Sequence, residues 1–442
     1  MKQTVCNASI ELFQVKNKPV IISQTGATVS SNGGFLAIHR MDRELGLIEK
    51  ISAVFVDGKR RREEAVQDVT RIEHRFSDLL QQRVYQIALG YEDGLDANRL
   101  RHDKSLQLAV GKDQALASQP MMSRLENWVS FKDIYRGMRE LVGVYAREFH
   151  DPQHAIVLHI DSTDDPVHGQ LGLFNGYYQE HCFHPLVIME ERSGFPFGIL
   201  LRRGQVSSAR YARSMLQRLI RWLREEIPGV AIVVKGDCAF GIGDILESLD
   251  AKSVDYIAGL SGNAVLYREV KALQEDVQTA YESTHKPLQR FMSFRYRAGT
   301  WQQERSVIAK VEHTGLGLNT RFVVSSMCTD DPASCYESFQ VRSGGIEALI
   351  EQLKNGLRFD KTACHSRVPN QMRYFENMLA FILHLKLQQK LKPVMEYTPK
   401  VQTIIQKVLK VAALITTSVR RFFIELSTAD PNTALLWHVL QT

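Results

Sequence analysis

The chain has 442 residues, of which 44% are hydrophobic and 24% are charged. This is the composition of a globular protein with a sizeable hydrophobic core, and it excludes a disordered chain, a collagen-like chain and a small disulfide-stapled scaffold. The formal net charge of +6 permits a nucleic-acid partner without requiring one. No apolar stretch is long enough to span a bilayer, and residues 1–18 lack the continuous apolar segment of a secretory signal. We therefore expect a cytoplasmic protein without a membrane partner.

The first third of the chain, residues 1–150, is expected to be mostly helical. In residues 71–89 the apolar side chains recur at spacings of three and four, which indicates a buried helical stripe, and residues 131–149 suggest another helix. A basic cluster is placed in the loop before the first of these helices: Lys59, Arg60, Arg61 and Arg62. We interpret its three arginines as candidate DNA contacts, with a merely solvated surface as the alternative.

After residue 150, short apolar runs rich in β-branched residues predict strands. Three of them follow one another and suggest an antiparallel meander, at residues 155–160, 170–174 and 186–189. Helices and strands then alternate: a helix that begins near Ser207 or Ser208, a strand at residues 231–234, a helix at 243–249 and a strand at 256–260. The order βββαβαβ is that of a ribonuclease H-like fold, an α/β class in which helices flank a mixed sheet.

Residues 262–329 mix short strands with aromatic and basic side chains, which predicts a β-rich insertion. Three of its residues are candidate DNA contacts, and a small satellite core is the alternative for the aromatic one: Arg295, Arg297 and Trp301. Further helices are expected at residues 346–357 and 374–389. The expected domains are a helical N-terminal region (1–150), a core in two parts (151–261 and 330–395) separated by the insertion (262–329), and a C-terminal helical segment (396–442).

Two carboxylates follow predicted buried strands, Asp161 after AIVLHI and Asp237 after AIVVKG. A charged residue at the end of a core strand is placed where it can leave the apolar layers and enter a cleft. A third candidate is Glu347, on the predicted late helix. In a regular helix Lys354 points the same way as Glu347, about 10 Å along the axis, and Arg342 precedes both.

Three carboxylates directed at one place repel one another unless cations lie between them. Mg²⁺ takes carboxylate oxygens and accepts phosphate oxygens as further ligands. The pattern therefore predicts two Mg²⁺ ions, with Mn²⁺ as a substitute, held by Asp161, Asp237 and Glu347, while Arg342 and Lys354 bind phosphate. Taken singly, an aspartate at a strand end is more often a turn or helix cap, and charges on one helix face are more often a solvated ladder.

Several sequence blocks together resemble one family. They include SSNGGFLAIHRMDRELGL (residues 30–47), HIDSTDDPVHG (159–169), KGDCAF (235–240) and YESFQVRSGGIEALIEQLKNGL (336–357). The chain is similar to the DDE transposases of bacterial insertion sequences, specifically the insertion-sequence thirteen-eighty family. Matched residue by residue, the family's acidic trio falls on Asp161, Asp237 and Glu347, and its basic companions on Arg342 and Lys354.

The resemblance implies a ribonuclease H-type catalytic domain interrupted by a β-rich insertion, and a helical N-terminal region that helps to recognise element ends. It implies a nucleoid-associated bacterial enzyme whose partners are the terminal inverted repeats and target DNA. Because two ends must be cut and joined together, we expect a homodimer on DNA. Two alternatives stay open: a metal-dependent nuclease without strand transfer, and a non-catalytic DNA-binding protein descended from a transposase.

Overall fold

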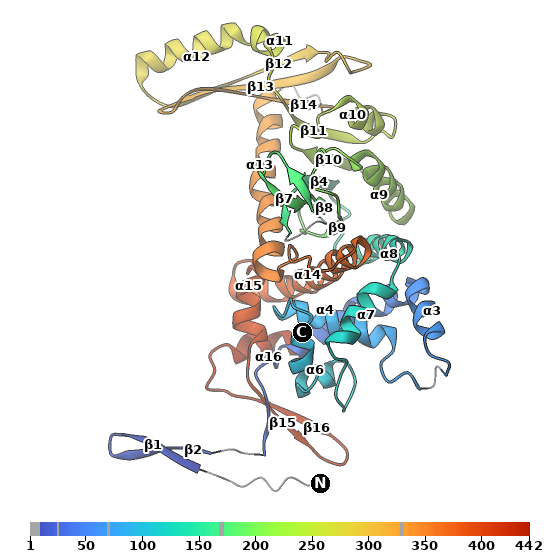
Figure 1. The fold of residues 1–442 in the computed structure, drawn as a ribbon. Helices are drawn as coiled ribbons and strands as arrows, with labels where there is room; N and C mark the ends of the chain where they lie inside the picture. The colour runs from blue at the N-terminus through green and yellow to red at the C-terminus, as the bar shows by residue number, and fades with distance from the viewer. Residues whose placement is uncertain (1–8, 24–25, 69–70, 168–171, 328–330) are drawn as a thin grey trace.

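In the computed structural model of the protein, an eight-stranded mixed sheet forms the centre of one half of the molecule (Figure 1). The structure describes residues 9–23, 26–68, 71–167, 172–327 and 331–442, with the backbone alone at residues 9, 23 and 341–344. In spatial order the strands are β12 (Leu288–Tyr296), β13 (Arg305–Thr314), β14 (Gly317–Ser325), β11 (Asp255–Leu260), β10 (Ile232–Gly236), β4 (Ile156–Ser162), β8 (Leu186–Glu190) and β9 (Pro196–Leu200).

Strands β4, β8 and β9 form an antiparallel meander, and β10 and β11 continue the sheet in parallel on the other side of β4. The apolar runs of β4 and β10 predicted these strands because a strand covered on both faces carries few polar residues. The expected run at residues 186–189 is the second strand of this meander, β8, and its third strand, β9, was not predicted. Pro196 and Gly198 weaken the strand pattern of β9, although a proline at the first residue of a strand costs little.

The segment expected as a strand at residues 170–174 lies partly outside the described residues. Its described end is β6 (Leu173–Asn175), which does not join the central sheet. It pairs instead with β7 (Glu180–Phe183), and β7 pairs with β5 (Asp165–Pro166). The short run therefore predicted a strand correctly but assigned it to the wrong sheet.

Helices cover both sides of the central sheet (Figure 1). Helices α9 (Ala212–Glu226) and α10 (Gly243–Asp250) lie on one side. The other side is crossed by α13 (Pro332–Glu351), which contacts β4 and continues into a π-helix, η2 (Gln352–Gly356). This late helix is longer than the predicted segment 346–357, because it begins at Pro332 with Asp331 as its N-cap.

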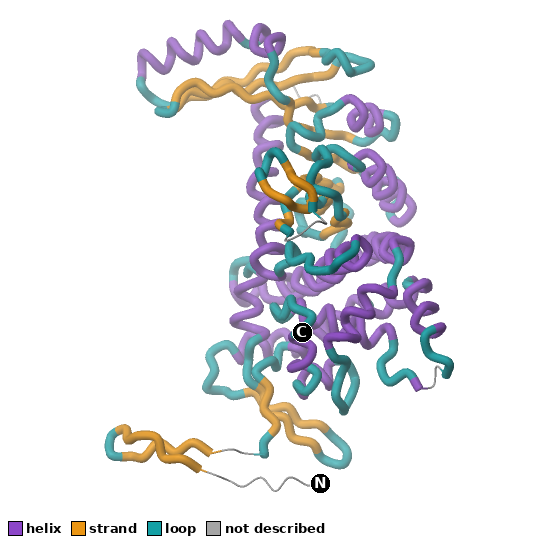
Figure 2. The backbone as a smooth tube through the Cα atoms, in the orientation of Figure 1, coloured by secondary structure: helices purple, strands orange, loops and turns teal. Residues whose placement is uncertain are grey.

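Most helices gather next to the sheet in a second region (Figure 2). These are α1 (Phe35–Leu45), α2 (Leu47–Val54), α3 (Val56–Glu64), α4 (Phe76–Ala88), α5 (Asp96–Leu100), α6 (Lys104–Ala109), α7 (Gln119–Trp128) and α8 (Phe131–Glu148). Helices α1, α4, α7 and α8 contact the long buried helix α14 (Arg367–Met395), which also contacts β9 and so connects the two regions. None of the described helices is long and apolar enough to cross a membrane.

The basic cluster at residues 59–62 lies within helix α3 and not in a loop, which corrects the prediction. The sequence did not predict this helix, because its run of charged residues has almost no apolar stripe. Neighbouring helices hold α3 in place instead. Its N-terminal N–H groups at Asp57 and Gly58 donate to the buried carboxylate of Asp133, at 2.9 and 3.1 Å. Tertiary hydrogen bonds therefore supply the cap that the local sequence lacks.

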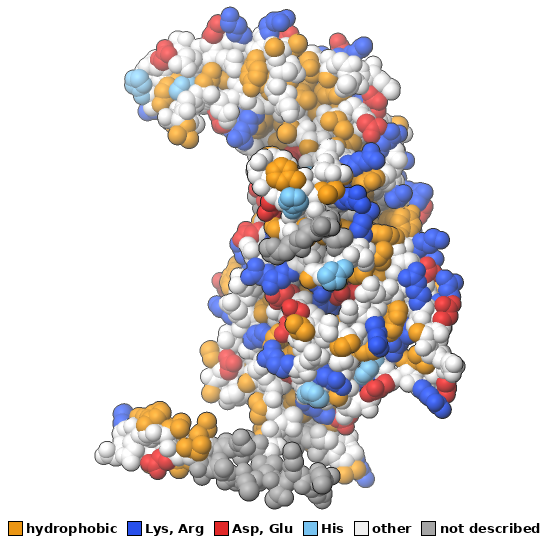
Figure 3. Space-filling view, viewed as in Figure 1, with side chains coloured by type: hydrophobic (Ala, Val, Ile, Leu, Met, Phe, Trp, Pro, Cys, Tyr) orange, Lys and Arg blue, Asp and Glu red, His pale blue; other side chains and the backbone are white. Residues whose placement is uncertain are grey.

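The predicted β-rich insertion is not a separate β module. It begins with two helices, α11 (Ala264–Glu269) and α12 (Lys271–Thr284), and its three strands continue the central sheet through antiparallel pairing of β14 with β11. The surface is hollowed between the end that carries α12 and the part of the molecule around β7 (Figure 3).

The C-terminal segment 396–442 is only partly helical. It contains α15 (Val401–Ile404), a π-helix η3 (Ile405–Leu409), a hairpin of β15 (Ala413–Thr417) and β16 (Phe422–Leu426), and α16 (Thr433–Gln441). The hairpin pairs with β3 (Thr28–Ser30) near the other terminus. Residues before β3 form a projecting hairpin of β1 (Ser9–Val15) and β2 (Lys18–Ser23), which the helical prediction for residues 1–150 did not include.

Candidate active site

Strands β4 and β10 bring Asp161 and Asp237 to neighbouring positions. The strands are parallel and in register, with Ile160 opposite Gly236, so the next residue of each chain segment is the aspartate. Both side chains are half-buried. Because side chains alternate along a strand, Asp161 points to the same side of the sheet as His159, the side that α13 crosses. The two aspartates predicted from the sequence therefore lie at the carboxyl ends of two adjacent parallel strands.

Local hydrogen bonds orient each carboxylate. Asp161 Oδ1 accepts from the N–H of Ser162 at 2.7 Å, and Asp237 Oδ1 accepts from the N–H of Ala239 at 2.8 Å. The turn after Asp237 passes close to β11 at Gly259, where an added Cβ would lie 2.7 Å from the N atom of Cys238. A side chain at residue 259 would therefore displace the turn that carries Asp237.

One half-buried carboxylate connects two strands of the site. Glu191 Oε2 lies 2.6 Å from His159 Nε2 and 2.7 Å from Lys235 Nζ, and these two residues are register partners on β4 and β10. Lys235 Nζ also donates to the carbonyl of Ser338 on α13 at 2.8 Å. Glu191 thus links the two strands that carry the aspartates, and Lys235 joins them to the helix that carries Glu347.

The electrostatics of Glu191 follow from these contacts. Burial raises the pKa of Glu191, but the hydrogen bonds and charges of His159 and Lys235 outweigh burial and hold the pKa at about 2. The carboxylate is therefore ionised throughout the physiological range. The buried Lys235 beside it is tolerated because it is paired with this carboxylate and hydrogen-bonded. Sequence reasoning missed this cluster, because Glu191 stands in the turn after β8 and carries no motif of its own.

Helix α13 places the third predicted acid. Its backbone at Gly345 lies against the His159 ring, since an added Cβ there would be 3.8 Å from His159 Cε1. Glu347 follows two residues later, and its side chain is exposed. Arg342 lies on the same helix, but its side chain is outside what the structure describes.

Lys354 lies in the π-helix η2, so the regular α-helical spacing assumed for Glu347 and Lys354 does not hold. Lys354 Nζ donates to Asp164 Oδ1 at 2.8 Å. Burial raises the pKa of Asp164, but Lys354 outweighs it and lowers the pKa below the ordinary value. π-Helical turns are often found at functional sites. Here the turn brings a lysine to the segment that follows Asp161.

The carboxylates of Asp161, Asp237 and Glu347 are oxygen ligands of the kind that a hard divalent cation prefers, but the three are not gathered into one cluster. Two aspartate carboxylates at adjacent strand ends are the oxygen ligands that Mg²⁺ prefers. Within the described part of the chain, no three His, Cys, Asp or Glu side chains lie close enough together to hold a metal ion. Asp161 and Asp237 therefore fit part of a magnesium site, and Glu347 completes it only if its exposed side chain moves toward them.

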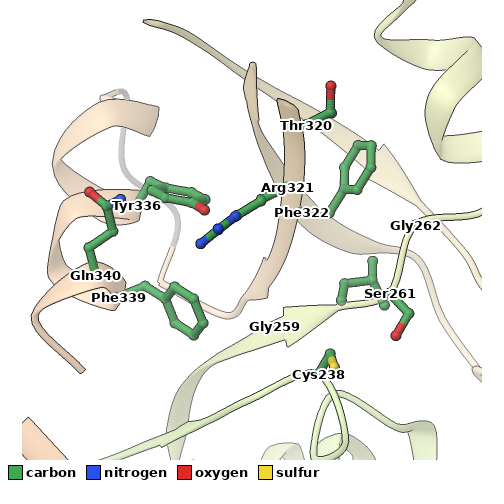
Figure 4. A pocket seen from close by; sticks show the side chains of 11 residues that line it. Cys238, Gly259, Ser261, Gly262, Thr320, Arg321, Phe322, Tyr336, Phe339 and Gln340 are labelled. Carbon is green, nitrogen blue, oxygen red and sulfur yellow. The ribbon is translucent and has the colours of Figure 1, made fainter. Parts of the chain in front are cut away.

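A pocket of about 300 Å³ is lined by Cys238, the residue that follows Asp237. Its wall includes Cys238, the loop after β11, and side chains of β14 and α13 (Figure 4). Arg321 extends into it between the aromatic rings of Tyr336 and Phe339 (Figure 4). Sequence reasoning did not single out Arg321, because an arginine within an alternating strand pattern reads as an ordinary solvent-facing residue.

The other predicted DNA contacts divide into exposed and buried residues. Arg60 and Arg61 are exposed, and so are Arg295 and Arg297 on or beside β12. Arg62 is instead buried, donates to the carbonyl of His74 and packs over the Trp128 ring.

Trp301 is only 4% exposed and packs beneath Arg305 and against Tyr296. Both Arg62 and Trp301 are therefore corrected to structural residues, since their contacts leave too little surface to bind DNA.

The family model described as "Transposase DDE domain group 1" matches residues 12–442, which is nearly the whole chain. The chain belongs to this DDE transposase family. A solved structure, the cryo-EM structure of the piggyBac transposase synaptic complex with hairpin DNA, is similar to it with a TM-score of 0.46 and 12% identity, over 85% of this chain and 79% of that chain. The comparison with curated proteins finds no match.

Proposed function

We propose that the protein is the transposase of a bacterial insertion sequence of the thirteen-eighty type. In this proposal it binds the terminal inverted repeats, cleaves a phosphodiester at each end, and joins the freed end to target DNA. The observation that carries the proposal is the in-register placement of Asp161 and Asp237 in a chain of the DDE transposase family. The strand order β9-β8-β4-β10-β11, with β10 and β11 parallel to β4, supports a catalytic core of ribonuclease H type.

The three acids are proposed to act as metal ligands. Asp161, Asp237 and Glu347 would hold two Mg²⁺ ions, which when bound activate the attacking oxygen and stabilise the leaving oxygen of an in-line displacement at phosphorus. The turn at Ala239 and the N–H of Ser162 keep one oxygen of each aspartate oriented, so each carboxylate enters the reaction already positioned. The same arrangement serves cleavage and joining, since both are displacements at phosphorus.

Basic side chains around the acids are proposed to hold the DNA backbone. Arg342 and Lys354 flank Glu347 in sequence, and Arg321 points into the pocket lined by Cys238. Lys354 is paired with Asp164, so a phosphate would compete with that carboxylate for the ammonium group. Arg321 and the exposed arginines at positions 60, 61, 295 and 297 extend the contact surface on either side.

A plasmid assay with element ends tests the proposal. Nicking and joining are expected in Mg²⁺ and not in the presence of a chelator. Asp237→Ala should reduce cleavage by at least about 10³-fold, because several kcal/mol of transition-state stabilisation depend on the metal site. Binding to the ends should survive in this variant.

The matched control is Asp244→Ala, an exposed acid at the start of α10 whose partner is Arg213. It should cleave normally. Full cleavage by Asp237→Ala would refute the assignment, and nicking without joining of a pre-cut end would favour the plain nuclease. End binding without any cleavage by the unaltered chain would favour the non-catalytic alternative.

A further inference from the structure

The β1–β2 hairpin has one apolar face that contacts water. Paired residues share a face, so the register places Ile10 with Ile22, and Phe13 with Val20, on one side of the hairpin. The opposite side carries the pairs Glu11 with Ile21 and Gln14 with Pro19. From Ile10 to Ile22 every residue is exposed except Val20, which is half-buried. An alternation of this kind is typical of a sheet that buries one face.

Such a hairpin needs a partner surface. Two strands alone are marginally stable in water, because they bury too little apolar area. The apolar side chains of the hairpin stand out clearly on the space-filling surface (Figure 3). We call residues 9–23 the arm.

A second apolar face lies at the same end of the molecule (Figure 1). The small sheet β16-β15-β3 packs one face inward, where Ala413 and Ile415 are buried. Its outer face carries three exposed apolar side chains, Val29, Leu414 and Phe423, and beside them the polar Thr416 and Glu425. Strand β3 of this sheet follows the arm in sequence, yet the arm and the outer face both stay exposed, so neither covers the other within one chain.

We propose that the arm of each chain packs its apolar face on the outer face of the β16-β15-β3 sheet of a second copy, so that two chains exchange arms. A reciprocal contact closes as a two-fold dimer, because each copy offers the same two surfaces. With roughly 100 Å² exposed on each large apolar side chain of the two faces, two contacts cover on the order of 1,400 Å², within the about 1,200–2,000 Å² of a stable interface.

This inference extends the proposed function, since a transposase that joins two DNA ends needs two active sites, but it does not rest on the catalytic assignment. The exchange links the chains through elements remote from the aspartates. It also gives the projecting arm the buried face that its own chain does not provide.

Sedimentation of the full chain without DNA tests the arm exchange. The unaltered chain should be a dimer at micromolar concentration, and Ile22→Asp should weaken the dimer at least about tenfold by placing a charge in an apolar contact. The matched control is Ile21→Asp. Ile21 and Ile22 are 58% and 55% exposed and lie on opposite faces of the arm, so the control should leave the dimer intact.

Cross-linking identifies the surface that receives the arm. A chain with Phe13→Cys, mixed with a differently tagged chain with Phe423→Cys, should form a disulfide between the two chains, and neither variant alone should form it. A monomeric unaltered chain, equal effects of Ile21→Asp and Ile22→Asp, or a disulfide formed only within a chain that carries both cysteines would overturn the proposal. None of these outcomes depends on cleavage, so the two proposals fail separately.

Discussion

Two regions of the molecule differ in where they place polar and apolar side chains. One is the sheet face under α13, and the other is the end formed by the arm and the β16-β15-β3 sheet. Under α13, His159, Lys235 and Glu191 are charged or polar residues inside the protein, and they are paired with one another. At the other end, Ile22 and Leu414 are apolar residues outside it, without cover.

Buried charged residues and exposed apolar residues are both unusual in a globular protein, and each indicates a different function. Buried ionic groups persist when a site needs rigid, oriented charges beside it, and here His159 and Lys235 lie two residues before the two proposed catalytic aspartates. Exposed apolar faces persist when their cover comes from elsewhere. The first region therefore carries out its role within one chain, whereas the second points to another chain.

Removing Glu191 should destabilise the region under α13, and we expect this substitution to have the largest effect on the free energy of unfolding. Glu191→Ala leaves the buried His159 and Lys235 without their carboxylate, and losing one partner of a buried ion pair costs about 3–5 kcal/mol. We expect a corresponding fall in the free energy of unfolding, measured by urea denaturation. We also expect cleavage to weaken, because Lys235, which anchors α13 to β10 through Ser338, loses the carboxylate that orients its ammonium group.

The control for this variant is Glu226→Ala. Glu226 pairs with Arg139 at 2.7 Å, a similar distance, but on the surface. Its loss should cost no more than about 1 kcal/mol. Equal effects of the two substitutions would mean that the Glu191 cluster does not behave as a buried pair.

The pH dependence of stability sharpens the same point. The pKa of Glu191 is about 2 in the fold, below its ordinary value of 4.5, so the unfolded chain binds more protons between these values. The contribution of Glu191 is complete above about pH 5 and is lost as the pH falls toward 2. Urea titrations at several pH values should show a steeper loss for the unaltered chain than for Glu191→Gln. Parallel curves would contradict the lowered pKa.

Two neighbouring residues of β15 lie on opposite faces of the small sheet and can be used to compare those faces. Ile415 is buried and Leu414 is exposed, and they point in opposite directions. Ile415→Ala should lower the free energy of unfolding by about 2–5 kcal/mol, and Leu414→Ala should change it by less than about 0.5 kcal/mol at concentrations where the chain is monomeric. A large effect of Leu414→Ala in the monomer would show that the outer face is covered within its own chain.

Much of the catalytic sheet was predictable from local sequence. The runs before Asp161 and Asp237 are continuous and β-branched, and the structure places them as adjacent parallel strands. The capping pair Ser130 and Asp133 marks the start of α8, where a helix was expected. These features depend on residues close in sequence, so periodicity and propensity were sufficient.

Other features depended on distant residues. The strands of the insertion were visible, but not their pairing with β11, which extends the catalytic sheet. The roles of Arg62 and Trp301 were misjudged because a basic or aromatic side chain gives no local sign of burial. Likewise, no spacing rule predicts that η2 replaces a regular helical turn at Lys354.

For this chain, local pattern was enough to identify core strands, most long helices and a set of candidate acids, since burial on a strand or helix face imposes a periodic choice of residue type. Local pattern was not enough to say which charges are paired, which apolar faces stay uncovered, or how near Glu347 lies to the aspartates. Those depend on contacts between segments far apart in the chain, which arise only when the whole sheet and its helices have packed.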